Sequence, residues 1–491
     1  SGQTGVRFNR DDAFRRISRS FHGVKDSEYA PPVSLQKTLR KYQRDGYRWL
    51  RTLDGYGMGG ILADDMGLGK TVQVLSYLLA MKQNGQTLPS LIVCPASLVL
   101  NWAEECQKFT PELSCVVVDG DAAHRAELAE SWPAADLVVT SYDLLRRDEA
   151  LYEGQEFYAC ILDEAQAIKN HTTQKYKAVC KVRSRVRFAL TGTPVENRLG
   201  ELWSIFSFLM PGYLPPYKSF CSRFEKPIVQ EEDQTAVRRL NQLTGPFILR
   251  RMKSDVLKEL PPKTENVYRI ELEEEQRKLY LAAVVDAREK LQAAKPEDKM
   301  AVFAVLMRLR EICCDPRLIA DNWEGGSAKL DACVELVSSA VEGGHRILLF
   351  SQFTSMLELL AKRLDAEGIS HFTLQGSTPK PVRAELVRRF NGGEVSVFLI
   401  SLRAGGTGLN LTAADIVIHY DPWWNVAAQN QATDRAYRIG QQNPVQVYKL
   451  IAQDTIEEKI VELQQAKQSL ADTVTGIADG AILSMRPDEL L

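Results

Sequence analysis

Residues Ile61–Thr71, ILADDMGLGKT, decide the fold class of this chain. The apolar run Ile61–Ala63 is typical of a buried strand, and two aspartates end it before a turn that closes with Gly69-Lys70-Thr71. A helical pattern follows from Val72. Strand, glycine-containing turn, lysine, threonine and helix are the order of a phosphate-binding loop, in which backbone N–H groups and the helix N-terminus face a triphosphate. The stretch therefore predicts an α/β domain that binds a nucleoside triphosphate.

Individual groups in this loop have predicted roles toward ATP and Mg²⁺. Lys70 is expected to neutralise the β- and γ-phosphates, and the Thr71 hydroxyl is expected to ligate magnesium. Asp64 stands where the strict GxxxxGK[ST] pattern has its first glycine, so GLGK taken alone is a weak signal. The loop residues expected to contact the nucleotide are Asp65, Met66, Gly67, Leu68, Gly69, Lys70 and Thr71.

The bulk properties are typical of a globular protein in a reduced intracellular compartment. The 491 residues suggest about three domains, with 45% apolar and 25% charged residues. A net charge of −2 argues against a passive, charge-driven DNA binder but allows a local basic groove. No apolar run approaches the ~18 residues of a membrane span, and the N-terminal stretch lacks an apolar signal core. The nine cysteines lack zinc-site spacing, and Cys313-Cys314 is expected to pack in a helix.

Short apolar runs, separated by polar or helical sequence, predict two parallel α/β cores in tandem. In the first core the runs are 91–94, 115–118, 137–140, 159–162 and 188–191, and in the second they are 347–350, 371–374, 397–401, 416–420 and 445–451. Several of the first runs end in polar residues, and ligands bind at the carboxyl ends of strands in open α/β sheets. These polar residues are therefore expected to form one site.

This alternation divides the chain into five expected segments. Residues 1–32 are an N-terminal remnant or linker, and 33–200 form a first lobe that binds ATP. Residues 201–325 read as mostly helical and form insertions and the inter-lobe connection, packed partly on the first lobe. Residues 326–455 form a second lobe, and 456–491 form a C-terminal bracing helix and tail.

Four further residues are candidates for catalysis. Asp163 ends the run 159–162 and is expected to hold magnesium, while Glu164 orients or deprotonates the attacking water. An isolated Asp-Glu pair at a strand end is more often a helix N-cap, so the reading depends on the phosphate loop upstream.

Arg435 and Arg438 lie three residues apart and are expected to project from one helix face toward the γ-phosphate, the alternative being a solvated basic face. The second core carries these arginines but no phosphate loop, which predicts ATP between the lobes and lobe closure on hydrolysis.

Other features leave two interpretations open. In the amphipathic helix expected at Leu39–Leu50, Gln43 is either a core residue or a partner of the adenine edge. The glycine-rich turn with Gly405, Gly406 and Gly408 suits phosphates of ATP or of nucleic acid. Trp423 and Trp424 read as one core aromatic and one contact to a polynucleotide.

The motifs, in their order along the chain, resemble those of the superfamily-two helicase-like ATPases. Among these ATPases they resemble the SWI/SNF family of double-stranded DNA translocases, over roughly residues 35–470. The first-lobe strings are LRKYQRDG, DDMGLGKT, LIVCPASLVLNW, VTSYDLLRRD, DEAQ and LTGTPVEN, and the second-lobe strings are LLFSQFTSMLELL, LQGSTPK, SLRAGGTGLNL and QATDRAYRIGQ. The most specific are FILRRMKSDVLKELPPK, LRxICxxPxL at 309–318, and DPWWN. The family usually has DEGH or DEAH, so Gln166 leaves open how the lobes are coupled.

This resemblance implies an α/β fold of two tandem RecA-like parallel-sheet lobes with family-specific helical insertions. It implies additional nucleotide contacts at Arg40, Gln43 and Gly406. The residues expected to grip DNA without reading its sequence are Pro95, Ser97, Asn101, Thr193, Gly376, Ser377, Thr407 and Trp424. Arg250, Arg251 and Lys253 either add local positive charge or are structural.

The implied function is an ATP-dependent, monomeric translocase on double-stranded DNA that remodels or displaces an unidentified DNA-bound protein. It would act at the nucleoid of a microbe or in a eukaryotic nucleus, with no membrane partner. The alternatives are a helicase that separates DNA or RNA strands and an ATP-binding scaffold without turnover. The helical insertion argues against the first alternative, and the intact catalytic residues argue against the second.

Overall fold

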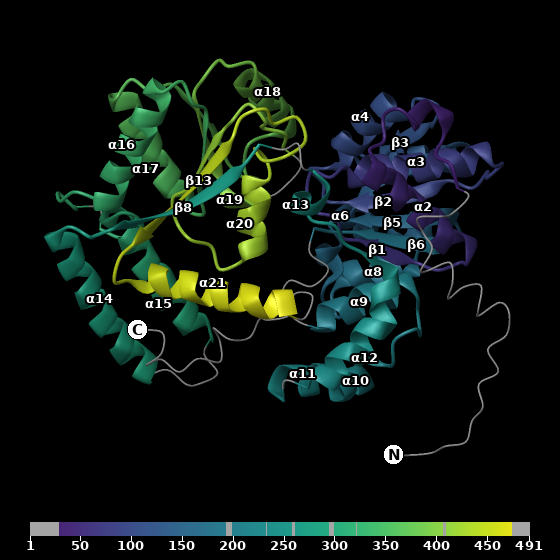
Figure 1. Ribbon diagram of the computed structural model, residues 1–491, viewed down its shortest axis with the longest axis horizontal. Coiled ribbons are helices and arrows are strands. Elements are labelled where there is room, and N and C mark those ends of the chain that lie inside the picture. The colour runs from purple at the N-terminus through teal and green to yellow at the C-terminus, as the bar shows by residue number, and fades with distance from the viewer. Residues whose placement is uncertain are drawn as a thin grey trace. The chain divides into compact units, whose positions relative to one another are not determined.

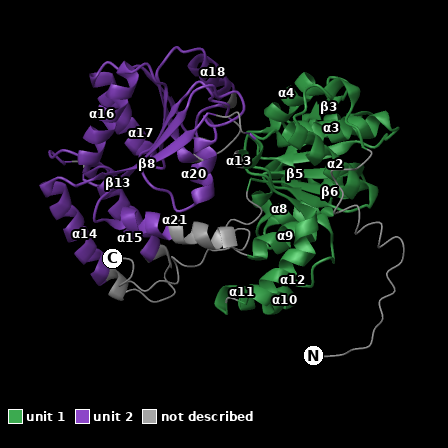
Figure 2. Cartoon of the chain, viewed as in Figure 1, with its two compact units in different colours: residues 1–256 green, residues 257–491 purple. Residues whose placement is uncertain are grey.

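The computed structural model describes residues 29–192, 199–231, 233–257, 261–293, 299–320, 322–405 and 409–473. The chain divides into two compact units, residues 1–256 (the first unit) and residues 257–491 (the second unit), coloured separately in Figure 2. Each unit contains one parallel β-sheet with its own helices (Figure 1).

The first unit contains a seven-stranded sheet in the order β3-β4-β2-β5-β6-β1-β7, in which the described neighbouring strands pair in parallel. Its strands are β1 (Gly60–Leu62), β2 (Ser90–Cys94), β3 (Cys115–Val117), β4 (Leu137–Ser141), β5 (Glu156–Asp163), β6 (Arg183–Leu190) and β7 (Ile248–Leu249). Strands β2 and β4 are buried along their whole length, which explains why they read as continuous apolar runs rather than as alternating ones.

Helices lie between and around these strands in the order of the chain. The helices of the first unit are α2 (Lys41–Gly55), α3 (Lys70–Gln83), α4 (Val99–Phe109), α5 (Ala122–Ser131), α6 (Tyr142–Arg147), α7 (Glu149–Tyr152), α8 (Gln174–Lys181), α9 (Leu199–Leu209), α10 (Tyr217–Phe220), α11 (Lys226–Gln230), α12 (Gln234–Thr244) and α13 (Lys253–Val256). The short strand β7 follows α12 and returns to the sheet beside β1, so the end of the insertion borders the phosphate loop.

The second unit contains a six-stranded parallel sheet in the order β10-β11-β9-β12-β13-β8. Its strands are β8 (Lys263–Ile270), β9 (Ile347–Ser351), β10 (His371–Leu374), β11 (Val397–Ser401), β12 (Ile416–His419) and β13 (Val445–Ala452). Its helices are α14 (Glu274–Ala293), α15 (Lys299–Cys314), α16 (Ala328–Glu342), α17 (Thr354–Ala366), α18 (Lys380–Asn391), α19 (Leu402–Gly405), α20 (Val426–Thr433) and α21 (Ile456–Thr473).

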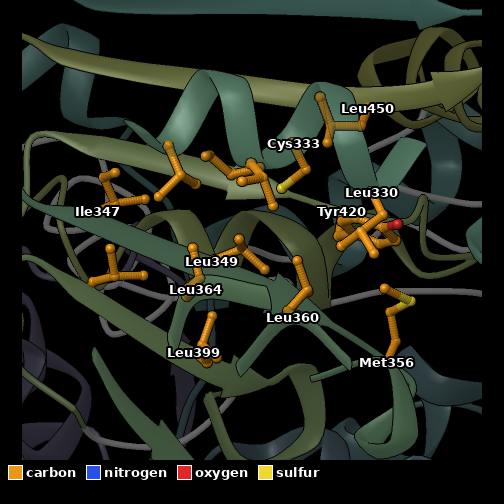
Figure 3. Close-up of a cluster of buried hydrophobic side chains, with 14 of the residues drawn as sticks. Leu330, Cys333, Ile347, Leu349, Met356, Leu360, Leu364, Leu399, Tyr420 and Leu450 are labelled. Carbon is orange, nitrogen blue, oxygen red and sulfur yellow. The ribbon is translucent and has the colours of Figure 1, made fainter. Parts of the chain in front are cut away.

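Strand β9 shows how this second sheet is buried on both faces. Ile347 and Leu349 lie in one hydrophobic cluster, whereas Leu348 and Phe350 lie in another, because successive side chains of a strand point to opposite faces. In Figure 3 the first cluster joins residues of α16 and α17, such as Leu330 and Leu360, to strand residues such as Leu349. Both faces of the sheet are therefore core.

The prediction of two tandem parallel α/β cores with helical insertions is confirmed, and each expected apolar run falls on a strand. Strand β8 differs, because it lies within the stretch that reads as mostly helical. Its sequence KTENVYRI has no apolar run, and seven of its eight residues are exposed, so only the pairing with β13 reveals it as an edge strand. The bounds of the five predicted segments stay predictions, and the structure divides the chain after Val256.

Two smaller predictions concern the adjacent cysteines and membrane-spanning helices. Cys313 and Cys314 end helix α15 and are fully buried in hydrophobic clusters, as expected for packing residues. Within the described residues, no helix has both the length and the apolar character that crossing a membrane requires.

Candidate nucleotide-binding and catalytic site

The phosphate loop joins the end of β1 at Leu62 to the start of α3 at Lys70. Gly67 and Gly69 have φ angles of 81° and 76°, a region in which a side chain is strained. A Cβ atom on Gly69 would also lie 2.5 Å from the amide nitrogen of Gln43. The Lys70 ammonium donates to the carbonyl of Asp64 at 2.6 Å, so the lysine reaches back across the loop from the first residue of the helix.

Helix α2 braces this loop from outside. The Tyr42 hydroxyl and the Gln43 amide both donate to the carbonyl of Leu68, each at 3.0 Å. The Gln43 carbonyl oxygen accepts from the backbone N–H of Arg40 at 2.9 Å. Burial raises the pKa of Tyr42 to about 12, which keeps its hydroxyl a donor. The nucleotide contacts predicted for Arg40 and Gln43 stay predictions, while Tyr42 and Gln43 visibly brace the loop.

The two aspartates of the loop bind protein groups. The Asp64 carboxylate is fully buried and accepts from Nε of Arg251 at 2.8 Å. The Asp65 carboxylate accepts from the backbone N–H of Lys253 at 2.9 Å. Of the two readings of Arg251, the structure therefore supports the structural one, because its guanidinium is paired inside the first unit.

Asp163 ends β5 at the carboxyl edge of the same sheet. One carboxylate oxygen accepts from the indole N–H of Trp102 at 2.9 Å and the other from the backbone N–H of Glu164 at 2.9 Å. Desolvation and the neighbouring Glu164 charge raise the pKa of Asp163 to about 7, against the opposing effects of Trp102 and the Lys70 ammonium. Lys70 and Asp163 therefore lie close enough to interact, although 93 residues separate them in the sequence.

Glu164 has a φ angle of 49°, which is uncommon for a residue with a side chain and is typical of functional sites. Its carboxylate accepts from the Gln166 amide at 2.8 Å. The Gln166 carbonyl oxygen in turn accepts from the hydroxyl of Thr191, just beyond β6, at 3.2 Å. The glutamine that departs from the usual family motif thus connects the candidate catalytic glutamate to the next strand.

Trp102 is a site residue that sequence reasoning missed. Its side chain is almost fully buried in α4, and its only signal was membership of the string LIVCPASLVLNW. An aromatic residue at a helical core position reads as packing, and only the fold brings its N–H to Asp163. The Tyr142 hydroxyl donates to the Asp163 carbonyl at 2.9 Å, so the candidate metal ligand is held by both backbone and side chain.

The residues present fit a magnesium ion. Magnesium takes hard oxygen ligands and keeps several waters, so a hydroxyl and a carboxylate beside phosphates suffice. The Thr71 hydroxyl follows Lys70 in the first turn of α3, and Asp163 supplies the carboxylate. Among the described residues, no group of three or more His, Cys, Asp or Glu side chains forms a metal cage.

The residues expected to grip DNA fall on both units. Pro95 and Ser97 lie between β2 and α4, and Asn101 lies in α4 with its amide bound to Glu105 at 3.2 Å. Gly376 and Ser377 are exposed beyond β10. The Arg383 guanidinium holds their loop by donating to the Gly376 carbonyl at 3.0 Å. Thr193, Thr407 and the predicted nucleotide contact Gly406 lie outside the described residues.

Trp424 is half-buried on the second unit, with the Arg310 guanidinium 5.5 Å from its ring centre. Trp423 is half-buried and packs against the hydrophobic cluster that contains Leu348 and Phe350. Both tryptophans therefore have packing contacts, and contact of Trp424 with DNA stays a prediction.

The prediction that Arg435 and Arg438 project from one helix is wrong. Helix α20 ends at Thr433, and both arginines lie in the turns that follow. After Thr433 the backbone N–H groups of Arg435 and Ala436 donate to carbonyls three residues back instead of four, and the Arg435 carbonyl accepts from the backbone N–H of Leu411 at 3.0 Å. Arg435 is buried, and Arg438 is half-buried with Nη1 donating to the Leu409 carbonyl at 3.4 Å.

Parallel α/β sheets in both units, and a phosphate-loop lysine beside an Asp-Glu pair, define a helicase-like ATPase. Residues 42–318 match the family model of the SNF2-related domain, and residues 328–440 match that of the helicase conserved C-terminal domain. The first match alone covers more than half of the 491 residues. The chain therefore belongs to the SNF2-related family.

Two relatives and one solved structure illustrate the similarity. The putative ATP-dependent helicase/translocase YwqA of Bacillus subtilis is 40% identical over 96% of this chain and 53% of its own length. Human TATA-binding protein-associated factor 172 is 36% identical over 97% of this chain and 30% of its own length. The Sulfolobus solfataricus SWI2/SNF2 ATPase core in complex with dsDNA is 36% identical, with coverage of 92% and 96% and a TM-score of 0.46. The chain spans about half the length or less of the curated relatives it matches.

Proposed function

We propose that this chain is the motor of an ATP-dependent translocase on double-stranded DNA that displaces or repositions a DNA-bound protein. The observation that carries the proposal is that the phosphate loop after β1 and the Asp163-Glu164 pair at the end of β5 belong to one parallel sheet, in a chain of the SNF2-related family. Relatives named as a helicase/translocase and as TATA-binding protein-associated factors support movement on DNA and a protein target bound to it. Its place would be the nucleoid or the nucleus.

In this proposal ATP binds with its phosphates against the loop of the first unit. Lys70 neutralises the β- and γ-phosphates, and Glu164, held by Gln166, orients the attacking water. Thr71 and Asp163 would hold Mg²⁺, which adds charge neutralisation at the phosphates. Arg435 and Arg438 of the second unit supply positive charge to the γ-phosphate as it is transferred.

The DNA contacts in this proposal are to the backbone. Loop residues such as Ser97 and Ser377 offer hydroxyl and N–H groups that bind phosphates without reading bases. The overall charge of −2 means that such contacts act locally rather than through a general attraction to DNA. A single chain acts as the motor in this proposal.

The first test is steady-state ATP hydrolysis with and without duplex DNA. We expect duplex DNA to stimulate turnover, with a stimulation that weakens as salt rises because phosphate contacts are screened. Equal turnover in the presence and absence of DNA would contradict the motor proposal.

A second candidate function is strand separation, because relatives carry the name ATP-dependent helicase. The two functions differ in which strand they release. A translocase displaces the third strand of a triplex ahead of it and leaves the duplex paired, whereas a helicase releases a labelled strand of the duplex itself. Duplex unwinding without triplex displacement would favour the second candidate.

A further inference from the structure

The phosphate loop is bound by Arg251, a residue 187 positions further along the chain than its partner Asp64. We propose that Arg251 is a positioning residue for the nucleotide: its ion pair with Asp64 sets the shape of the phosphate loop and connects that loop to the segment that ends the first unit. This inference rests on the proposed assignment of the loop as the ATP site.

The ion pair is bidentate and buried. Nε of Arg251 donates to one Asp64 oxygen at 2.8 Å, and Nη2 donates to the other at 2.5 Å. The side-chain exposures are 13% for Arg251 and 0% for Asp64. A buried ion pair seldom stabilises a fold more than an apolar pair of the same shape would, so stability alone is a weak reason for it. Precise placement of the loop is a stronger one.

The guanidinium also touches the helices on either side of the loop. Nη1 donates to the Tyr42 carbonyl in α2, and Nη2 donates to the Gln73 side-chain carbonyl in α3 at 2.8 Å. Gln73 itself donates to Asp64 at 3.1 Å and to the Gly69 carbonyl at 3.2 Å. One planar group with several donors thus joins three elements, which the single nitrogen of a lysine cannot do.

Helix α2 has a glycine, Gly46, where the Arg251 guanidinium packs against it. A Cβ atom on Gly46 would collide with the side-chain carbonyl of Gln73 and lie 2.8 Å from Nη2 of Arg251. Glycine in a helix interior is destabilising relative to alanine, so its presence needs a local reason. The space it leaves is filled by the guanidinium and its partner amide.

The backbone extends the connection. The N–H of Ala63 donates to the Leu249 carbonyl at 2.7 Å, and the N–H of Asp65 donates to the Arg251 carbonyl at 3.0 Å. The N–H of Lys253 then binds the Asp65 carboxylate. Residues 249–253 therefore follow the loop residue by residue and lead directly into α13, the last helix of the first unit. A phosphate that shifts the loop must also shift this segment.

The test uses Arg251→Lys in the full chain and a fluorescent ATP analogue. We expect the Kd of the analogue and the KM for ATP to rise by roughly ten-fold, with kcat changed far less, because the loop is misplaced while the catalytic carboxylates are not. Gly46→Ala should produce the same pattern from the opposite side of the contact. Unchanged Kd and KM in both variants would overturn the proposal.

Arg125→Lys is the matched control. Arg125 forms a bidentate, buried pair with Asp148, at 2.6 and 2.9 Å, and also donates to a backbone carbonyl, but it lies away from the loop. A loss of folded protein in both lysine variants with no rise in KM would show that Arg251 is merely structural. Lys70→Ala distinguishes a failure of the ATP-site assignment from a failure of the role proposed for Arg251. Analogue binding that survives this change would overturn the ATP site itself rather than the role of Arg251.

Amide hydrogen exchange tests the connection to the segment. In the unaltered chain, the ATP analogue should protect residues 249–253 together with the loop. In Arg251→Lys at saturating analogue, protection should remain in the loop and fall in the segment. Protection confined to the loop in the unaltered chain would overturn the proposed connection.

Discussion

Two arginines, one in each unit, bind an aspartate at the carboxyl end of a strand, and they differ in what that aspartate belongs to. Arg251 binds Asp64 after β1, and Arg310 binds Asp421 after β12. Both arginines come from the family-specific strings, and both aspartates are buried. In the first unit the aspartate is part of the phosphate loop, whereas in the second it fixes the turn that carries the two tryptophans.

The difference lies in the neighbours of each pair. Asp64 touches Gln73, which also binds the Gly69 carbonyl of the loop. Asp421 accepts from the Ser351 hydroxyl at 2.6 Å, and Arg310 lies over the ring of Trp424. In our proposal the same kind of ion pair serves ATP binding in one unit and the stability of a turn in the other. The Arg310→Met variant tests this separation directly.

Lys70→Ala should have the largest effect on activity. The loop would lose the charge that neutralises the β- and γ-phosphates, so we expect ATP turnover to fall to background. Hydrolysis is measured with and without DNA. Lys82→Ala, on the same helix with an exposed salt bridge to Asp136, is the control and should retain activity. Turnover that survives Lys70→Ala would place catalysis elsewhere.

Arg438→Ala tests whether the second unit completes the ATP site. We expect ATP binding to be kept and kcat to fall by about 10³-fold, the size of effect attributed to arginines that stabilise a transferred phosphoryl group. Analogue binding and single-turnover hydrolysis separate the two steps. An unchanged DNA-stimulated rate would show that Arg438 takes no part in hydrolysis.

Arg310→Met should destabilise the second unit by about 3–5 kcal/mol, because it leaves the Asp421 carboxylate buried without its partner. Denaturant unfolding measures this loss, and the Kd of an ATP analogue for the folded protein should stay unchanged. The exposed pair Arg388–Glu385 supplies the control, since Arg388→Met should leave the free energy of unfolding nearly unchanged. Weaker ATP binding by folded Arg310→Met would break the contrast between the two arginines.

Trp102→Phe should have the smallest effect, a loss of about 10- to 100-fold in magnesium affinity or activity, as is usual for groups that orient a metal ligand. The measurement is the Mg²⁺ dependence of ATP hydrolysis. Trp132→Phe is the matched control, because its indole N–H is buried without a hydrogen-bond partner in the described part of the chain. Equal magnesium requirements in the two variants would remove Trp102 from the site.

The sequence by itself determined the strands, the phosphate loop and the family. Buried parallel strands need continuous apolar runs, and a triphosphate needs glycines, a lysine and a hydroxyl at fixed local spacing, so both leave marks over a few residues. The placement of the phosphate loop and Asp163 in one sheet was likewise inferred, because strand ends of a parallel sheet converge on one edge. The exposed edge strand β8 left no such mark.

Only the tertiary structure decided the partners of Asp64, Asp163, Arg435 and Arg438. A buried carboxylate takes whichever donor the fold brings to it, and the donors here, Arg251 and Trp102, are 187 and 61 residues away. Helix α20 ends at Thr433, and the Arg435 carbonyl beyond it accepts from a distant N–H, that of Leu411. Long-range hydrogen bonds of this kind compete with local pattern, and no short stretch of sequence records which of the two prevails.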